Sequence, residues 1–492
     1  METEMTDMSQ PSLLATGRGK LILALLCAVG FLDFVDASIV NIALPSVRHD
    51  LHMSVQSLQW LLSGYLLTYG GFMLLGGRAA DLLGRRRVLV GGTSLFALSS
   101  LGAGLAGSAG VLVGARLAQG AGAALMLPSV LSLLTTNFKE GGDRTKALGI
   151  WGAVGGLASA VGVLFGGALT QGPGWRWVFF VNPPICVLVL AATFWLIPGE
   201  RRRAQLANFD IRGAVLSTTG MLLLVYGLVR APVVGWGSAR ALAELGGAFG
   251  LLAMFVINER RNKNPLLPLS VFRIQGLAAA DVTQLIAIAG IISMFFFLTL
   301  YMQEVLHYSP IRTGLSYLPV TIGVGVAAGV SAKLTARTGT RPVMVAGSLV
   351  AAAGVYCLSR IPVHGSYVAD MLPGMVAMSL GLGAVFVGVT TAANAGVPAH
   401  QSGLAASLLN ASQQLGGALG LAIFSAIATS RTDHLLAART ALPEALTSGF
   451  SRALLASSIF LLAAGVIATR SHSAHGEAGQ TVAARLPEPV RA

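Results

Sequence analysis

Long apolar stretches separated by short polar ones run through most of the chain. Fourteen of them reach the length of about 20 mostly apolar residues that one helix needs to cross a bilayer. Their first residues lie near Leu21, Leu58, Val88, Val111, Ala147, Trp177, Ile211, Leu242, Leu277, Thr313, Val343, Val368, Gly403 and Arg452. The pattern predicts an all-α integral membrane protein with fourteen transmembrane helices.

The loop between the second and third segments has a degenerate copy in the second half of the chain. Residues 77–87 read Gly-Arg-Ala-Ala-Asp-Leu-Leu-Gly-Arg-Arg-Arg, and residues 332–342 read Ala-Lys-Leu-Thr-Ala-Arg-Thr-Gly-Thr-Arg-Pro. Gly84 and Gly339 are 255 positions apart, and each copy joins two apolar segments. An internal repeat of this kind predicts two related six-helix bundles, as in many transporters.

The repeat sets the expected domain boundaries. The first bundle should span residues 20–198 and the second residues 277–470, with a linker and two inserted helices at 199–276. The remaining segments, 1–19 and 471–492, are polar, lack periodicity and are expected to be cytoplasmic tails.

Composition and charge support a membrane protein. The chain is 54% hydrophobic and 11% charged, whereas soluble domains carry about a quarter charged residues. We assign about 23 of the 33 Lys and Arg residues to the two tails and the even-numbered loops, and about nine to the odd-numbered loops. This asymmetry predicts a multi-pass protein of the plasma (inner) membrane with both termini cytoplasmic, surrounded by lipid. It also explains the net charge of +13 without a nucleic-acid partner.

Several familiar chemistries are not expected. Cys27, Cys186 and Cys357 all fall inside predicted spans and are interpreted as packing residues, without a metal site. The Gly-x-Gly-x-x-Gly pattern of residues 102–107 also lies within a span, so we expect no dinucleotide cofactor. No phosphate-binding Gly-x-x-x-x-Gly-Lys-[Ser/Thr] loop is present, which argues against ATP hydrolysis. We therefore expect no cofactor.

Charged residues at membrane depth are costly and usually functional. In the first segment Asp33 and Asp36 lie about 60° apart on a helix, with Asn41 about 80° to the other side of Asp33, so they form one polar stripe. At about 1.5 Å per residue, Asp36 lies about 24 Å along its segment, and Arg116 about 8 Å below the outer end of the fourth. In a hydrocarbon core of about 30 Å both fall in the outer half, where they can meet.

We expect Asp36, with Asp33 beside it, to bind and release a driving proton while Arg116 modulates it. Alternation between hydration and an arginine neighbour would load the proton on one side and release it on the other. The alternative is a static buried ion pair that only fixes helix register. The second half has no counterpart of either charge at the 255-residue offset, so coupling should reside in the first half.

The loop residues Gly77, Asp81, Gly84, Arg85 and Arg86 lie where the second and third segments meet the cytoplasm. They are expected to form a conformational latch, in which Asp81 accepts from arginines and helix N-termini in one state only. The alternative is ordinary cytoplasmic positive charge.

A further set is expected to line a substrate cavity, because apolar walls with a few polar groups suit amphipathic ligands. Its members are Asn41, Trp60, Tyr65, Gln119, Trp151, Tyr301, Gln303, Asn410 and Gln413. For each aromatic residue, packing or a lipid-facing position is the alternative.

Two acidic residues and three glycines complete the candidates. Asp281, four residues into the ninth segment, is interpreted as a boundary residue, with a substrate ligand as the alternative. Glu304, at an outer end, is interpreted as solvated. Three glycines of the fifth segment should allow close helix packing: Gly162, Gly166 and Gly167.

The motifs together resemble the major facilitator superfamily and, within it, the fourteen-helix drug/proton antiporters. They comprise residues 32–45 (Leu-Asp-Phe-Val-Asp-Ala-Ser-Ile-Val-Asn-Ile-Ala-Leu-Pro), the loop at 77–86, Arg-Leu-Ala-Gln-Gly at 116–120, residues 175–183, and residues 409–417. The resemblance covers roughly residues 20–470. Two positions depart from the family pattern: Leu82 replaces a basic residue, and Val163 replaces the proline of the antiporter motif in the fifth segment.

The resemblance implies a bacterial efflux transporter that exchanges a small hydrophobic or amphipathic drug for protons, by rocking of the two bundles. A second interpretation is a dedicated exporter of one endogenous metabolite or self-made antibiotic. A third is a membrane-embedded enzyme or sensor. An enzyme would need a convergent His, Ser or metal cluster and a sensor a large soluble domain, and the sequence offers neither. We therefore expect a transporter and not an enzyme.

Overall fold

The computed structural model describes residues 13–138, 142–199, 210–262, 265–267, 272, 274, 276–395, 397, 402–471 and 473. Every regular element in these residues is a helix. The predicted all-α architecture is therefore confirmed. The outer parts of both predicted tails, residues 200–209 and most of residues 263–275 lie outside the described residues.

The helices form two groups, and a further pair lies between these groups in the sequence. The first group contains η1 (Leu13–Ala15), α1 (Gly17–Asp50), α2 (Val55–Leu58), α3 (Trp60–Leu83), α4 (Arg85–Gly104), α5 (Ala109–Asn137), α6 (Gly142–Gln171), α7 (Trp177–Phe180) and α8 (Asn182–Leu196). The pair is α9 (Ile211–Val234) and α10 (Ala239–Arg261). The second group contains α11 (Leu277–Leu300), η4 (Tyr301–Val305), α12 (Pro310–Ser316), α13 (Leu318–Thr338), α14 (Thr340–Leu358), η5 (Tyr367–Met371), α15 (Leu372–Asn394), α16 (Ser402–Ala437) and α17 (Leu442–Ala468).

Thirteen helical segments of the described chain are long and apolar enough to cross a membrane. The predicted third span, α4, is not among them. Its first turn carries Arg85, Arg86 and Arg87, and glycine and serine occupy several later positions, which lowers its apolar content. The predicted count of fourteen thus depends on α4, which packs along α5 and α8 like its neighbours.

The two copies of the repeated loop have the same backbone geometry. Gly84 is the single residue between α3 and α4, with φ 97°, and Gly339 is the single residue between α13 and α14, with φ 86°. A side chain is strained at such angles, so glycine is required in both copies. These two residues mark the same end of the bundle, which we call the Gly84 end; the opposite end, where α1 stops, we call the Asp50 end.

The helix that follows each loop also packs in the same way. A Cβ added at Gly92 on α4 would lie 2.9 Å from the carbonyl oxygen of Gly122 on α5. A Cβ added at Gly347 on α14 would lie 2.9 Å from the carbonyl oxygen of Gly381 on α15. Both crossings therefore need a glycine for backbone-to-backbone contact.

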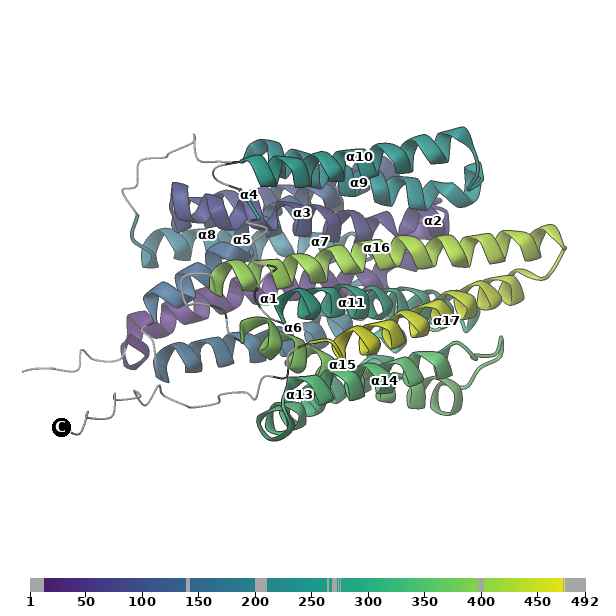
Figure 1. Ribbon diagram of the computed structural model, residues 1–492. Coiled ribbons are helices and arrows are strands. Elements are labelled where there is room, and N and C mark those ends of the chain that lie inside the picture. The colour runs from purple at the N-terminus through teal and green to yellow at the C-terminus, as the bar shows by residue number, and fades with distance from the viewer. Residues whose placement is uncertain are drawn as a thin grey trace, which may run out of the picture.

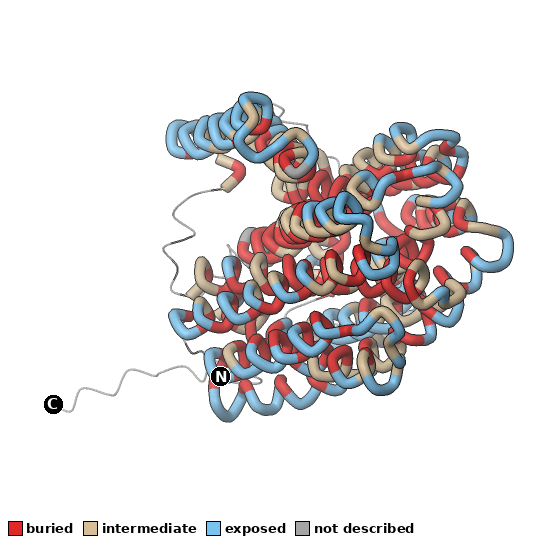
Figure 2. The backbone as a smooth tube through the Cα atoms, turned by 90° about the vertical axis from the view of Figure 1, so that its right-hand side faces the viewer, coloured by how far each residue is buried: buried red, intermediate tan, exposed pale blue. Residues whose placement is uncertain are grey.

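The helices run side by side, with α9 and α10 along the upper edge of Figure 1, α13 and α14 along the lower edge, and α16, α1 and α11 between them. The two groups meet where α3 packs on α16, where α6 packs on α12 and α13, and where α1 contacts α11. At an offset of 255 residues α3 corresponds to α13 and α6 to α16, so the first two contacts repeat each other. Figure 2 shows the exposed positions on the outward faces of the helices and the buried positions toward the middle.

Candidate functional site

A buried ion pair joins α1 to α5. Arg116 Nη1 donates to Asp36 Oδ2 at 2.6 Å, and both side chains are 0% exposed. Arg116 Nε also donates to the carbonyl oxygen of Leu61 on α3 at 2.9 Å, and its guanidinium carbon lies 4.2 Å from the ring centroid of Tyr65. A buried pair is stable only when its other hydrogen-bonding groups are also satisfied. Around this pair, α3, α5 and α8 supply further hydrogen-bonding groups.

The second oxygen of Asp36 is also fully engaged. Asp36 Oδ1 accepts from Gln119 Nε2 at 2.8 Å and from Asn182 Nδ2 at 2.8 Å. Gln119 accepts from Arg116 Nη1 at 2.7 Å, so the amide links both charges. One cation and two amides around a carboxylate match the needs of its anionic form. The network leaves one donor and one acceptor unpaired among the described residues, Arg116 Nη2 and Asn182 Oδ1.

Asp33 has a different environment one helical turn away. Its Oδ1 accepts from the Tyr65 hydroxyl and its Oδ2 from the Tyr69 hydroxyl, both at 2.8 Å. Both donors belong to α3, and the Asp33 side chain forms no ion pair within the described chain. The two aspartates of α1 are thus held by neutral phenols and by an arginine, respectively.

Sequence reasoning missed three members of this network: Ser100, Asn182 and Tyr69. Asn182 also donates to Ser100 Oγ at 3.0 Å, and Ser100 donates to the carbonyl oxygen of Phe179 at 2.9 Å. The sequence did mark Asn182, because it is a polar residue followed by proline at the start of the apolar helix α8. Only the packing of α8 against α1 and α4 brings that amide to Asp36.

Asn41, the third member of the predicted stripe, faces the second half of the chain. Its Nδ2 donates to Thr299 Oγ1 at 2.8 Å and to the carbonyl oxygen of Phe295 at 3.3 Å, both on α11. The Tyr317 hydroxyl lies 3.0 Å from the same Thr299 oxygen and donates to the same Phe295 carbonyl. The single stripe expected from the sequence is therefore divided among three neighbouring helices.

Toward the Asp50 end, α1 also contacts η4, which directly follows α11. Gln303 Nε2 donates to the carbonyl oxygen of Ile42 at 3.0 Å, and Arg48 pairs with Glu304. The interpretation of Glu304 as a solvated residue was wrong, because its side chain is 17% exposed and bonded to α1. The two groups of helices are thus closed against each other on this side of the ion pair.

The residues expected to line one cavity do not converge. Tyr65 and Gln119 belong to the carboxylate network, Asn41 to the contact between α1 and α11, and Gln303 to the contact between α1 and η4. Asn410 donates to its own helix at Ala406, Gln413 accepts from Gln284 at 3.2 Å, and Tyr301 bonds to the carbonyl oxygen of Pro362 at 2.5 Å. Trp60 and Trp151 line or adjoin two separate surface grooves.

Residues expected to act as a latch lie at the junction of α3 and α4. Arg86 Nη2 donates to the carbonyl oxygen of Phe194 at 3.2 Å and its guanidinium carbon lies 5.0 Å from the Phe194 ring, which ties the loop to the end of α8. Arg85 Nε is buried without a hydrogen-bond partner in the described chain. Asp81 is exposed in the last turn of α3. Gly77, one turn earlier, has ordinary van der Waals room for a Cβ.

The three glycines of α6 lie at helix crossings. A Cβ at Gly162 would lie 1.9 Å from Ser38 Oγ, and one at Gly166 would lie 2.8 Å from the carbonyl oxygen of Ile39. Gly167 meets the second half, since a Cβ there would lie 2.8 Å from the carbonyl oxygen of Pro310. Although Val163 replaces the motif proline, α6 runs without interruption from Gly142 to Gln171.

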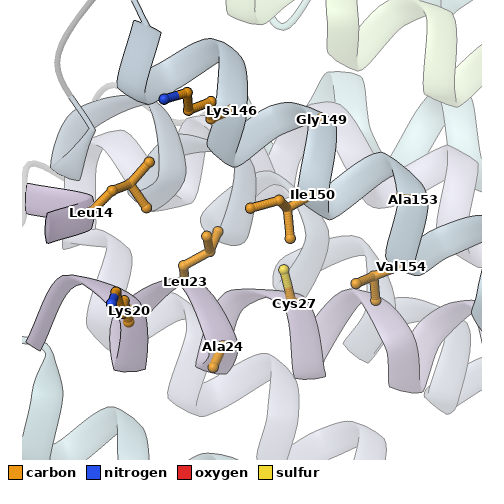
Figure 3. Close-up of a pocket in the computed structure, with 10 residues that line it drawn as sticks. All are labelled: Leu14, Lys20, Leu23, Ala24, Cys27, Lys146, Gly149, Ile150, Ala153 and Val154. Carbon is orange, nitrogen blue, oxygen red and sulfur yellow. The ribbon is translucent and has the colours of Figure 1, made fainter. Parts of the chain in front are cut away.

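A groove opens between α1 and α6 at the Gly84 end. Figure 3 shows its ten lining residues, with the thiol of Cys27 in its middle and the two lysines toward one end. Its volume is about 670 Å³, and its walls are largely apolar. Deeper along the same helices, a Cβ at Gly30 would lie 2.7 Å from the indole nitrogen of Trp151. The groove is lined by Leu14, Lys20, Leu23, Ala24, Cys27, Lys146, Gly149, Ile150, Ala153 and Val154.

A second groove of about 620 Å³ lies between α3, α5 and α9. Trp60 and Tyr226 face each other in its wall, with ring centroids 6.4 Å apart. Trp60, expected in a central cavity, therefore lines the junction with the inserted helices.

Comparison with known proteins gives one family. The family model of the Major Facilitator Superfamily matches residues 26–421. The puromycin resistance protein pur8 of Streptomyces alboniger is 38% identical over 430 residues, covering 87% of this chain and 85% of the relative. The cephamycin export protein CmcT of Amycolatopsis lactamdurans is 37% identical over 459 residues, covering 92% of each. The tetracenomycin C resistance and export protein of Streptomyces glaucescens is 36% identical over 425 residues, covering 86% of this chain and 77% of the relative.

Solved structures share the fold. A bacterial homolog of the human lysosomal transporter Spinster, in an inward-facing and occupied conformation, matches with a TM-score of 0.64 at 17% identity. The match covers 93% of this chain and 98% of that one.

Proposed function

Because the chain belongs to the Major Facilitator Superfamily, whose members are transporters and not enzymes, we propose that it exports drugs or antibiotics in exchange for protons. The three curated relatives are named for resistance to, or export of, antibiotics. The substrate is then a small hydrophobic or amphipathic molecule. The observation that carries proton coupling is the fully buried Asp36–Arg116 pair in a membrane helix bundle.

Alternating access follows from where the two halves touch. Asn41, Gln303 and Arg48 bind the second half toward the Asp50 end, while the groove beside Cys27 opens at the Gly84 end. We assign the Gly84 end to the cytoplasm, because the basic loops predicted to be cytoplasmic lie there. This state is then closed to the outside, and compounds enter from the cytoplasmic side.

The proposed architecture keeps the six-two-six division of the chain. Residues 20–198 and 277–470 form the two rocking bundles, and α9 and α10 form the inserted pair. Both termini lie in the cytoplasm, and the protein resides in a bacterial inner membrane. The repeated glycine geometry of the two halves supports this division.

Coupling requires a change at the carboxylate. Protonation of Asp36 removes its negative charge, so Arg116 loses its counter-ion and keeps the Leu61 carbonyl, Gln119 and the Tyr65 ring. A proton changes the equilibrium between the two states only if its affinity for Asp36 differs between them. Loss of the ion pair in one state would produce that difference in affinity. Asp33 lies one turn away on α1, and we assign it a part in the same binding and release of the proton.

The alternative substrate range is one endogenous metabolite or self-made antibiotic. Each of the three curated relatives carries the name of one antibiotic or antibiotic class, which favours a narrow range as the second candidate. Susceptibility of an expressing strain to puromycin, a cephamycin, tetracenomycin C and a cationic dye separates the two. Protection against several of them supports a broad exporter, and protection against one supports a dedicated exporter.

The test of proton coupling is efflux of the protected compound with and without an uncoupler. We expect the uncoupler to stop export by the wild type and Asp36→Asn to lose proton-driven export. Asp50→Asn is the matched control, because Asp50 lies on the same helix and pairs with Arg176 at 2.7 Å but is 46% exposed. Normal export by Asp36→Asn would show that the buried pair is only structural, and efflux that survives the uncoupler would exclude proton drive.

A further inference from the structure

Asp281, an acidic residue of the membrane region, has no partner among the residues that the structure describes. Asp281 on α11 is 3% exposed. Neither of its carboxyl oxygens has a hydrogen-bond partner within the described chain, and the residue forms no ion pair there. In contrast, Asp36 has a cation and two amides, and Asp33 has two phenols. Asp281 keeps the position near the end of its helix that the sequence predicted, but its side chain is buried.

Asp281 lies toward the seam between α11 and α16. One helical turn further along α11, the carbonyl oxygen of Leu285 would lie 2.2 Å from a Cβ at Gly416. Two turns along, Ile288 Cγ2 would lie 3.7 Å from a Cβ at Gly417. Residues at spacings of four and seven share one face of a helix, so Asp281 continues this row toward the Gly84 end. We call these contacts the α11–α16 seam.

No charged side chain of the described residues forms an ion pair with Asp281. The helices that pack on α11 are α16, α17, α15 and α1. The charged and titratable residues of α16 and α17 lie in the halves near the Asp50 end, apart from Arg470 just beyond α17, and α15 has none. Those of α1 are bonded elsewhere, lie at its two ends or, in the case of Cys27, line the groove beside α6. The groups in question are Arg431, Asp433, His434, Glu444 and Arg452, with Arg18, Lys20, Cys27, Asp33, Asp36, Arg48, His49 and Asp50 on α1.

A bare carboxylate in such a place is far more costly than a neutral acid. A resident metal ion would need several oxygen ligands, and no group of three or more His, Cys, Asp or Glu side chains in the described residues could hold one. A proton needs only the carboxyl group itself. We propose that Asp281 is a second proton-binding site, located in the second half of the transporter and occupied in this state.

The site also has a route to water. Asp281 lies about 6 Å from the start of α11 at about 1.5 Å per residue, close to the end that we assign to the cytoplasm. When the α11–α16 seam admits water, the O–H bond of Asp281 breaks, a cytoplasmic water takes the proton, and the carboxylate becomes hydrated. This role in transport rests on the proposed proton-driven export, whereas the bound proton itself does not.

Infrared spectroscopy of the purified full-length protein tests the bound proton directly. We expect the wild type at neutral pH to show a carbonyl stretch of a protonated carboxylic acid that is absent from Asp281→Asn. Asp36→Asn should retain this band, because Asp36 carries its charge in the ion pair. Asp281→Glu keeps an acid at the same place and should show a band of its own. It is the second variant to measure if Asp281→Asn folds poorly. Superimposable spectra of the wild type and Asp281→Asn would overturn the proposal.

Proteoliposomes test the coupling. The probe is the first compound among puromycin, a cephamycin and tetracenomycin C that the wild type exports. A gradient of one pH unit changes the equilibrium ratio of substrate across the membrane about tenfold for each coupled proton. We expect Asp281→Asn to lower this ratio about tenfold and Asp281→Glu to keep it. An unchanged ratio would overturn the coupling role of Asp281, whereas an infrared band with uncoupler-resistant efflux would overturn only the proposed proton drive.

Discussion

Separating the two charges of the buried pair should reveal how strongly they depend on each other. Asp36→Asn leaves Arg116 without a counter-ion, and Arg116→Gln leaves Asp36 with only Gln119 and Asn182. Loss of one partner of a buried pair costs about 3–5 kcal/mol. Because each remaining group keeps at least two neutral partners, we expect the lower value, about 3 kcal/mol of unfolding free energy for each single variant.

The double variant Asp36→Asn/Arg116→Gln carries no unpaired charge. Its two amides can bond to each other and to their neighbours, so the total cost should stay near about 3 kcal/mol and not reach about 6. The interaction energy from the cycle is then about 3 kcal/mol. The exposed pair of Asp50 and Arg176 is the control and should give less than about 1 kcal/mol, because water screens it.

Reversible denaturation of the purified protein in detergent micelles, followed by circular dichroism, gives these free energies. Additive costs in the double variant would refute the argument that the pair is electrostatically coupled. Transport then separates the two interpretations of the pair. If the pair couples protons, the double variant folds but exports without a proton dependence. Proton-dependent export by the double variant would show that the pair only sets helix register.

The other predictions concern helix packing, the closed outer contact and the groove. Gly162→Val should lower the unfolding free energy by about 1–3 kcal/mol, because a Cβ would already lie 1.9 Å from Ser38 Oγ, and an unchanged denaturation midpoint would contradict this crossing. Arg48→Ala removes the partner of Glu304 and should loosen the contact that closes this end. Reagents outside the cell should then label residues near that contact faster than in the wild type, and an unchanged labelling rate would contradict this. In a variant whose other cysteines are serine, Cys27 should react with a maleimide and be protected by exported compounds, and equal labelling with and without compound would exclude the groove from their path.

The sequence predicted the broad architecture because the relevant signals are local. Apolar length and polar breaks identify helices one at a time, and the repeated loop can be compared by position alone. The matching angles of Gly84 and Gly339 show why both copies need glycine. The meeting of Asp36 and Arg116 could also be predicted, because depth in a membrane follows from position along a helix.

The partners of the site residues depended on helix rotation and packing, which periodicity does not specify. Asn182 reaches Asp36 across 146 positions, and Asn41 reaches Thr299 across 258. The cavity candidates separated for the same reason, because an aromatic or amide residue within a span is compatible with several neighbours.

The sequence alone determined which segments are long and apolar enough to cross a membrane and that the chain repeats itself, and it predicted the depth of their charges. Tertiary structure decided which side of each helix meets which neighbour, and so gave Asp36 an arginine, Asp33 two tyrosines and Asp281 no partner among the described residues. The physical reason is that hydropathy acts on each segment separately, whereas hydrogen bonds and ion pairs require the exact approach of side chains from distant segments.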